Sequence, residues 1–421
     1  MNRPLLGSGG LALALVAGGF LLAYQFVEPA PPKELTLATG GPDGAYHKLG
    51  QSLATLLAEE GIELRLTTSA GSQENAALLA AGEVDVALMQ GGTRTDKTAE
   101  TPVVALASLY FEPLWLFHRV GLDPIPQELE ELAPLRISRG AAGSGTRDLV
   151  DELLQLNGVT LTSLALPAPA DPDSALVAGA LDVLAVVAGE SSPRVQKLLA
   201  DPAVRLLDLP RANAYPLHRR YLSALQLPAG AIDLATDNPP EDRRLIGVAA
   251  MLVAREDLHP ALVDLLLMAS PTVVGAPGLF QQRDQFPSPD YLSLPLADEA
   301  RRFHQRGPSF LQSILPFWAA TLIDRLIVMV IPLLALLLPL IRLLPPVYRW
   351  RVRSRIYRWY EDLRQLESRL DREGVSTELL HQVAELDREV KQVDTPLSYA
   401  DELYHLRSHI KLVRTRAEET S

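Results

Sequence analysis

The chain contains no cysteine, and this absence excludes disulfide bonds, thiolate catalysis and cysteine-ligated metals together. Enzyme signatures are also lacking. The sequence has no G-x-x-x-x-G-K-[ST] run, no G-x-S-x-G elbow and no H-E-x-x-H pair, so nucleotide cradles, nucleophile elbows and zinc-protease helices have no support. The eight histidines are scattered. We therefore expect a protein that is not an enzyme and that uses no catalytic residue, metal or cofactor.

Acidic residues are absent from Arg342 to Arg358, a stretch with six arginines, although the net charge of the chain is −12. Such a cluster beside an apolar run is typical of membrane topology rather than of a nucleic-acid site, so we expect no nucleic-acid partner. With 421 residues, 48% hydrophobic and 21% charged, the chain has room for two or three domains and is not generally disordered.

Two apolar segments frame the chain. Residues 11–27 are either an uncleaved anchor, which we favour because no A-x-A cleavage site follows, or a signal peptide. Residues 326–344 carry Arg342 as their only charge and are long enough to span a ~30 Å hydrocarbon layer, although a buried core helix is the alternative. The arginines that follow, and Arg3, predict that both termini lie in the cytoplasm and that residues of about 33–315 lie outside it, in the periplasm. We therefore expect the chain to be anchored in the bacterial inner membrane.

One pattern occurs twice, about a hundred positions apart. The first copy has an apolar run at 35–38, the turn "TGGPDGAYHKLG", a helix to about Glu60, a strand at 63–68, the turn "SAGSQ" and the strand-like "AAGEVDVALMQGG". The second has a strand at 135–139, "GAAGSGTRDLVDELLQLNG", a strand near 161–166 and "VAGALDVLAVVAG". This order of strands, glycine turns and helices predicts two doubly wound α/β units. Two such units suggest two lobes with a ligand cleft between them.

Polar turns precede three predicted helices, where free N–H groups and the helix dipole favour an anion. Each turn supplies residues that we expect to bind a ligand. They are Gly40 and Gly41 in the first turn, Ser72 and Asn75 in the second, and Gly143, Ser144, Gly145, Thr146 and Arg147 in the third.

Charged side chains near these turns have two interpretations. Arg147 could hold a carboxylate in a bidentate contact, or it could pair with Asp148 or Asp151 on its own helix. Glu112 and Glu190 lie near predicted strand ends and could face either the cleft or solvent. We expect Asp85 and Asp182, equivalent in the two copies, to be structural.

Taken in order, these blocks resemble the TAXI-type solute receptors of tripartite (TRAP) transporters, which are NMT1-like periplasmic binding proteins. The resemblance covers about residues 34–310 and includes "SLYFEPLWLFHR", with "GSGT" as its most specific motif. It implies an α/β, two-lobed periplasmic-binding-protein fold (type II-like), a small carboxylate solute such as an amino or organic acid, and TRAP membrane permease subunits as partners. It adds Thr39, Tyr46 and Gln90 to the expected ligand contacts.

The expected domains follow from these segments. Lobe I comprises residues 33–118 and 216–315, and lobe II comprises residues 119–215, after an N-terminal anchor or signal peptide at 1–32. A transmembrane helix at 320–345 and a cytoplasmic helical tail at 346–421 complete the chain, and the tail's apolar residues at helical spacing predict a hairpin. Because TAXI-type receptors usually lack such a span, a membrane-tethered sensor that signals through this tail is the alternative function.

Overall fold

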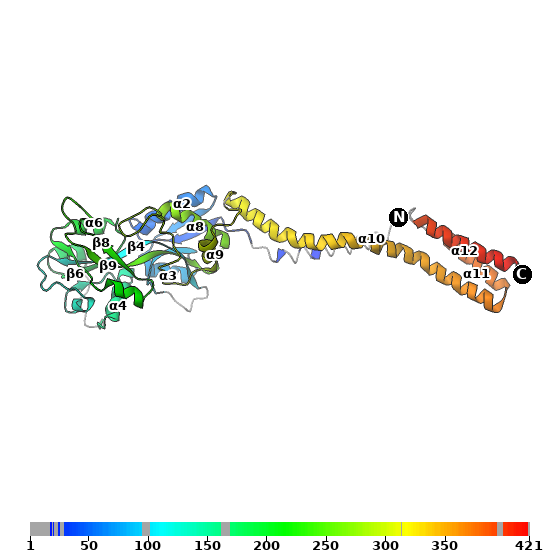
Figure 1. The fold of residues 1–421 in the computed structure, drawn as a ribbon, viewed down its shortest axis with the longest axis horizontal. Helices are drawn as coiled ribbons and strands as arrows, with labels where there is room; N and C mark the ends of the chain where they lie inside the picture. The colour runs from blue at the N-terminus through cyan, green and yellow to red at the C-terminus, as the bar shows by residue number, and fades with distance from the viewer. Residues whose placement is uncertain are drawn as a thin grey trace. The chain divides into compact units, whose positions relative to one another are not determined.

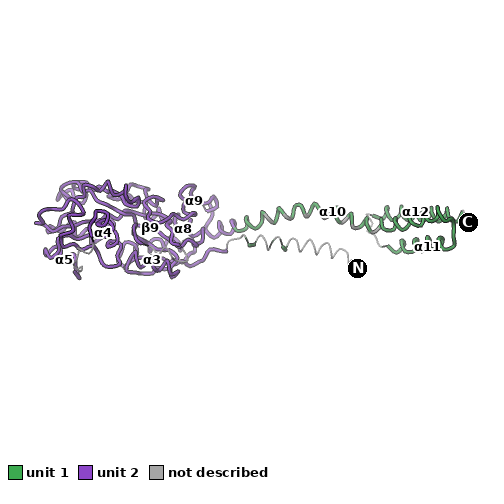
Figure 2. Tube along the Cα trace, turned by 90° about the horizontal axis from the view of Figure 1, so that it is seen from below, with its two compact units in different colours: residues 1–28, 325–421 green, residues 29–324 purple. Residues whose placement is uncertain are grey.

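The computed structural model describes residues 17–18, 20, 24–25, 29–94, 102–160, 169–312, 314–393 and 399–419. The chain divides into two compact units, coloured in Figure 2. The larger unit consists of residues 29–324, and the smaller one combines residues 1–28 with residues 325–421.

The first repeat folds as alternating strands and helices, close to the predicted ranges. Its elements are β1 (Glu34–Ala38), α2 (Ala45–Glu59), β2 (Glu63–Thr67), α3 (Ser72–Ala80) and β3 (Val86–Gln90). β1 lies between β2 and β3 and is parallel to both. Because parallel strands need a crossover connection, α2 and α3 each carry the chain back along the sheet.

The second repeat has the same order over its described part. Its elements are β5 (Ile137–Ser138), α4 (Gly145–Leu156), α5 (Pro172–Val177) and β6 (Val183–Val187), with β5 parallel to β6. β5 is shorter than the strand predicted at 135–139. The strand predicted near 161–166 lies outside the described residues.

Two long strands join the halves of this sheet. β4 (Val103–Arg119) pairs with β9 (Arg243–Arg255) from Val103 to Pro113, and with β6 from Leu114 onward. β9 also pairs with β3 of the first repeat, so the chain returns to that half at β9. In Figure 1 both strands lie between the part that holds α2 and α3 and the part that holds β6 and α4.

The remaining elements of the larger unit extend or cover the sheet, whose strand order is β2-β1-β3-β9-β4-β6-β5. β7 pairs with β4, and β8 pairs with β9. These elements are η1 (Leu129–Leu132), α6 (Pro193–Ala200), β7 (Val204–Leu206), η3 (Ala212–Ala214), α7 (Tyr215–His218), β8 (Ser223–Leu227), α8 (Pro260–Val274) and α9 (Asp298–Arg306).

The equivalent aspartates of the two repeats, Asp85 and Asp182, each accept hydrogen bonds from a neighbouring strand. The Asp85 carboxylate accepts hydrogen bonds from the backbone N–H and hydroxyl of Thr36, at 2.9 and 2.6 Å. The Asp182 carboxylate accepts from the backbone N–H and guanidinium of Arg136 and from Arg119. Each carboxylate thus ties the start of its strand to the neighbouring strand, as expected for a structural role.

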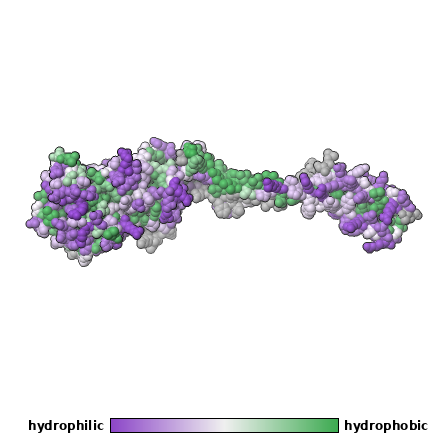
Figure 3. All heavy atoms as spheres, in the orientation of Figure 1, coloured by the Kyte–Doolittle hydropathy of each residue, from purple (hydrophilic) through white to green (hydrophobic). Residues whose placement is uncertain are grey.

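The smaller unit contains the C-terminal helices α10 (Phe317–Glu373), α11 (Thr377–Lys391) and α12 (Ala400–Glu419), of which α10 begins within the larger unit. Apolar residues of all three pack together, among them Ile356, Leu386 and Leu406. The predicted hairpin therefore packs on itself. α10 is long and apolar enough to cross a membrane by length and composition, and hydrophobic residues gather along its first part in Figure 3.

Candidate functional site

The larger unit contains a cavity of about 780 Å³ that both repeats line, and we call it the cleft. The starts of α2, α3 and α4 contribute to it, together with β4, the loop after β6 and residues 273–281. Most of the sequence-predicted site residues line the cleft, namely Gly40, Tyr46, Ser72, Gln90, Ser144, Gly145 and Thr146. The two glycine turns and the "SAGSQ" turn therefore meet at one place.

The three helix starts differ in how they are capped. Gly44 and Gly71 precede α2 and α3 and offer no side-chain cap, whereas the Ser144 hydroxyl accepts from the backbone N–H of Arg147 at the start of α4. Gly71 has φ 126°, a conformation that favours glycine. Helix starts without a side-chain cap leave backbone donors for another acceptor, such as a carboxylate in the cleft.

The other predicted residues, Thr39, Gly41, Asn75, Gly143 and Arg147, are not among those that line the cleft. Two of them, Thr39 and Asn75, are buried and stabilise the strand and helix ends next to the cleft. The Asn75 amide donates to the carbonyls of Thr39 and Leu88 at 2.6 and 2.8 Å. The Thr39 hydroxyl donates to the carbonyl of Thr67 at 3.2 Å. These bonds fix the end of β1 against β2, β3 and the start of α3.

Arg147 lies beside an acid of its own helix. Its Nε donates to Asp151 at 3.2 Å, and its Nη1 reaches the carbonyl of Gly140 at 3.5 Å. Asp151 also pairs with Arg139, which is 8% exposed. Of the two interpretations of Arg147, the structure favours the salt bridge within α4.

Hydrogen bonds link the two repeats across the cleft. The Gln90 amide donates to the carbonyl of Gly145 at 3.0 Å, and Gln73 bonds Asp148. On the far side, both carboxylate oxygens of Glu190 accept from the backbone N–H of Leu279, at 3.0 and 2.8 Å. The two halves are thus held against each other by polar contacts at the cleft rim.

Glu112 is the main residue of the cleft that the motifs did not select. It lies on β4, where that strand passes from one half of the sheet to the other, and it is 6% exposed. The Tyr46 hydroxyl donates to it at 2.8 Å. Burial raises the pKa of the Glu112 carboxyl to about 7, although the Tyr46 hydrogen bond lowers it. Its place near a predicted strand end was a signal, but a weak one.

Tyr110 lines the cleft two residues before Glu112. Its hydroxyl is buried and has no hydrogen-bond partner within the described part of the chain. Burial, followed by the charge of Glu112, raises the Tyr110 pKa well above its ordinary value. Buried hydroxyls normally have partners, so the Tyr110 hydroxyl is a candidate contact for a solute in the cleft.

The charge of the cleft is negative. Of the described residues that line it, the charged ones are Asp43, Glu112 and Glu190 against Lys48, with no arginine among them. Among the described residues no group of three or more His, Cys, Asp or Glu side chains could hold a metal ion.

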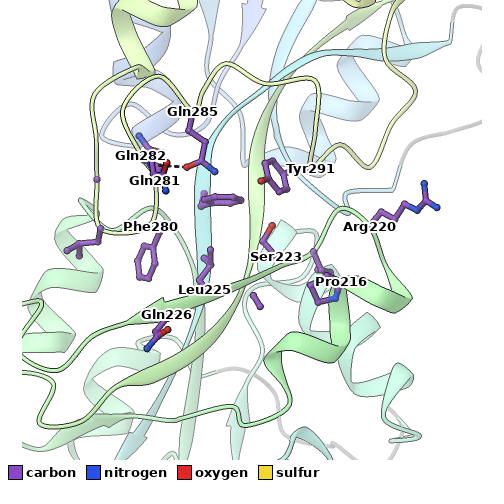
Figure 4. Close-up of a pocket in the computed structure, with 15 residues that line it drawn as sticks. Pro216, Arg220, Ser223, Leu225, Gln226, Phe280, Gln281, Gln282, Gln285 and Tyr291 are labelled. Atoms are coloured by element: carbon purple, nitrogen blue, oxygen red, sulfur yellow. Dashed lines mark hydrogen bonds between the residues drawn. The ribbon is translucent and has the colours of Figure 1, made fainter. Parts of the chain in front are cut away.

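A second cavity of about 680 Å³ lies beside β8 and shares Phe111, Gly278, Phe280 and Gln281 with the cleft. In Figure 4, Gln281, Gln282 and Gln285 lie on loops opposite the strand that carries Ser223 and Leu225. Arg220 is the one charged residue among the described residues that line it. The Ser223 hydroxyl, on a residue 7% exposed, has no hydrogen-bond partner in the part of the chain that the structure describes.

Two halves of an α/β sheet, joined by two long strands and lining one polar cleft, are the arrangement of a periplasmic-binding-protein fold. The fold is therefore the predicted one. The model of the NMT1-like family matches residues 37–269, more than half of the chain, so this chain belongs to the NMT1-like family.

Several solved structures share parts of this fold. The periplasmic aliphatic sulphonate binding protein SsuA of Escherichia coli is 15% identical, with 58% of this chain and 73% of that one covered and a TM-score of 0.39. The amino acid ABC transporter substrate-binding protein AbpA of Streptococcus pneumoniae, bound to L-arginine, is 17% identical, with coverages of 57% and 89% and a TM-score of 0.35. Similarities this low say nothing about which solute this chain binds.

Proposed function

We propose that this chain is a membrane-tethered solute receptor that binds a small carboxylate solute, an amino acid or an organic acid, outside the cytoplasm and delivers it to TRAP-type permease subunits. The observation that carries the proposal is the convergence of three helix starts on one cleft formed by both repeats. The helix starts supply donors for a carboxylate, and a cavity of this size accommodates a metabolite.

The subtype and the permease partner rest on the resemblance of the glycine turns and the "GSGT" loop to TAXI-type receptors. The apolar part of α10 supports a tether in the membrane. We propose lobes that meet in the cleft, with β4 and β9 as the connecting strands. Among the described residues that line the cleft, the Ser144 and Thr146 hydroxyls bond backbone groups rather than a histidine or carboxylate base, which supports binding without turnover.

The test is a thermal-shift and calorimetric screen of the full chain in detergent against amino acids, dicarboxylates and keto acids, with neutral sugars and simple cations as controls. A solute present at 100 times its Kd should stabilise the protein by about 2.7 kcal/mol. Shifts for sugars or cations, with none across the acids, would contradict the proposal.

Transport is tested separately, once a solute is identified, by its uptake into cells with and without this chain. Loss of uptake in cells that lack the chain supports delivery to a permease. Unchanged uptake would instead favour the alternative, a tethered sensor that signals through its C-terminal helices.

A further inference from the structure

We propose that Glu112, Tyr46 and Tyr110 form a subsite for a positively charged amino group, so that the solute is an amino acid rather than an organic acid without an amine. This inference rests on the proposed function and narrows its solute class. The three residues come from two elements, α2 and β4, and all line the cleft.

The first argument is the missing counter-charge of Glu112. It is buried, yet none of the ion pairs in the described part of the chain involves it, and Tyr46 is its one hydrogen-bonding side chain there. A carboxylate can accept about four hydrogen bonds, and a buried charge without a partner is costly. An ammonium group of the solute would supply both the charge and the donors.

The second argument is the unpartnered Tyr110 hydroxyl. Tyr110 and Glu112 are two positions apart on one strand, so their side chains leave the same face of the sheet. An ammonium group has three N–H donors, and it could reach the Glu112 carboxylate and the Tyr110 hydroxyl together. The Glu112 carboxylate, which lacks a counter-charge, and the Tyr110 hydroxyl, which lacks a hydrogen-bond partner within the described residues, then contact the same ligand group.

The third argument is the charge of the whole cleft. With Lys48 as the one basic residue among its described lining residues, against three acids, the cleft disfavours a solute that carries only negative charge. A zwitterion matches both parts of the cleft, the helix starts with its negative group and Glu112 with its positive group. Its carboxylate meets the uncapped N–H groups at the starts of α2 and α3, and its ammonium group meets Glu112.

A protonated Glu112 that donates to an organic acid is the competing arrangement, and the two differ in their pH dependence. The other titratable groups facing Glu112 are Tyr46 from α2 and Tyr110 from β4. Asp43, Lys48 and Glu190 line the rest of the cleft. An ammonium solute needs the ionised carboxylate, so its affinity should fall up to tenfold per unit as the pH drops below about 7. An organic acid without an amine should instead bind more tightly at low pH.

The experiment compares matched solutes by titration calorimetry on the full chain in detergent. The pairs are L-glutamate with 2-oxoglutarate, and L-alanine with L-lactate. We expect at least one amino acid to bind a hundredfold or more tightly than its partner, with Glu112→Gln removing most of that preference. Glu256→Gln, an equal charge change at an exposed residue outside the cleft, should leave it intact.

Tyr110→Phe provides a second test. A purely structural residue would lower stability when changed, whereas we expect this variant to lose affinity and keep its stability. It removes a buried hydroxyl for which the described residues offer no partner, so the solute-free protein should unfold at an equal or higher temperature. Its affinity for the amino acid should nevertheless fall about tenfold. Oxo or hydroxy acids that bind as tightly as their amino partners would overturn the inference and leave the proposed function standing. No binding by any acid would instead overturn the proposed function.

Discussion

The Glu112 carboxyl makes stability depend on pH in the direction opposite to that of most acids. Its pKa is raised by burial from 4.5 to about 7, so the folded state keeps a proton that the unfolded state has lost between these two values. The free energy of unfolding should therefore fall by about 3 kcal/mol as the pH rises through this window. Asp182, whose pKa Arg136 holds well below its usual range, titrates at lower pH and does not interfere.

Denaturant unfolding of the solute-free chain and of Glu112→Gln checks this linkage. At pH 5 the two proteins should be about equally stable, because both side chains are neutral. At pH 7.5 the variant should be the more stable one although it binds the solute less well, the usual trade-off at a functional site. An equal stability difference at both pH values would contradict the expectation.

Arg147 is expected to stabilise α4 rather than to hold the solute. Its pair with Asp151 is partly exposed, at 32% and 24% for the two side chains, and such i, i+4 pairs contribute about 0.3–0.5 kcal/mol. Arg147→Ala should therefore lower stability slightly and leave the Kd unchanged. Arg139→Ala, which removes the more buried partner of Asp151, should cost more stability. A tenfold or larger loss of affinity in Arg147→Ala would instead place the guanidinium on the ligand.

Sequence reasoning found the part of the site that is encoded locally. Turns at helix starts have their own residue signature, so Ser72, Ser144 and Gly145 could be selected. The direction of the Arg147 side chain depends on Asp151 and Gly140, and a turn pattern does not encode it. Glu112 was still harder to predict as a site residue, because its burial arises only when β4 and α2 are brought together.

At the scale of the elements, the two aspartates that precede β3 and β6 offer a matched pair. Asp182 accepts from two arginines and a backbone N–H, whereas Asp85 bonds one threonine. Because Asp182→Asn weakens charge-assisted hydrogen bonds to two guanidinium groups that are 29% and 42% exposed, it should destabilise the protein by about 2 kcal/mol. Asp85→Asn should cost about 1 kcal/mol. Thermal unfolding measures both, and loss of solute affinity without loss of stability would contradict their structural role.

The start of α4 must approach Gln90 closely, which a side chain at Gly145 would prevent. A Cβ there would lie 2.8 Å from Gln90 Oε1, so Gly145→Ala should break the Gln90–Gly145 bond across the cleft and weaken solute binding about tenfold, or 1.4 kcal/mol. Gly41→Ala is the matched control, because no atom lies within 4 Å of its added Cβ. Equal affinities for the two variants would show that this contact is unimportant to binding.

The elements themselves were predicted well where the glycine turns separate them, as in the first repeat. The point at which the chain passes from one half of the sheet to the other was not predicted. β4 leaves β9 for β6 at Pro113–Leu114, within one continuous strand. Strand pairing depends on residues far apart in sequence, so neither that passage nor the pairing of β8 with β9 was readable from local pattern.

At the scale of the whole molecule, the sequence predicts both termini in the cytoplasm and residues of about 33–315 outside it. The physical reason is the retention of positive charge on the cytoplasmic side. Five arginines, at 349, 351, 353, 355 and 358, follow the apolar run of α10 without an acid between them, and Arg3 precedes the N-terminal apolar segment. Moving such a cluster across the bilayer is far costlier than keeping it inside.

Reporter fusions check this topology. A fluorescent protein fused at Ser421 should fold and fluoresce, and alkaline phosphatase at the same site should be inactive. A phosphatase fusion after Leu225 should be active, because that residue is expected outside the cytoplasm. Edman sequencing of the mature chain decides whether residues 11–27 are retained. An active phosphatase at Ser421 would place the C-terminal helices outside, and neither a cytoplasmic tail nor signalling through it could then be maintained.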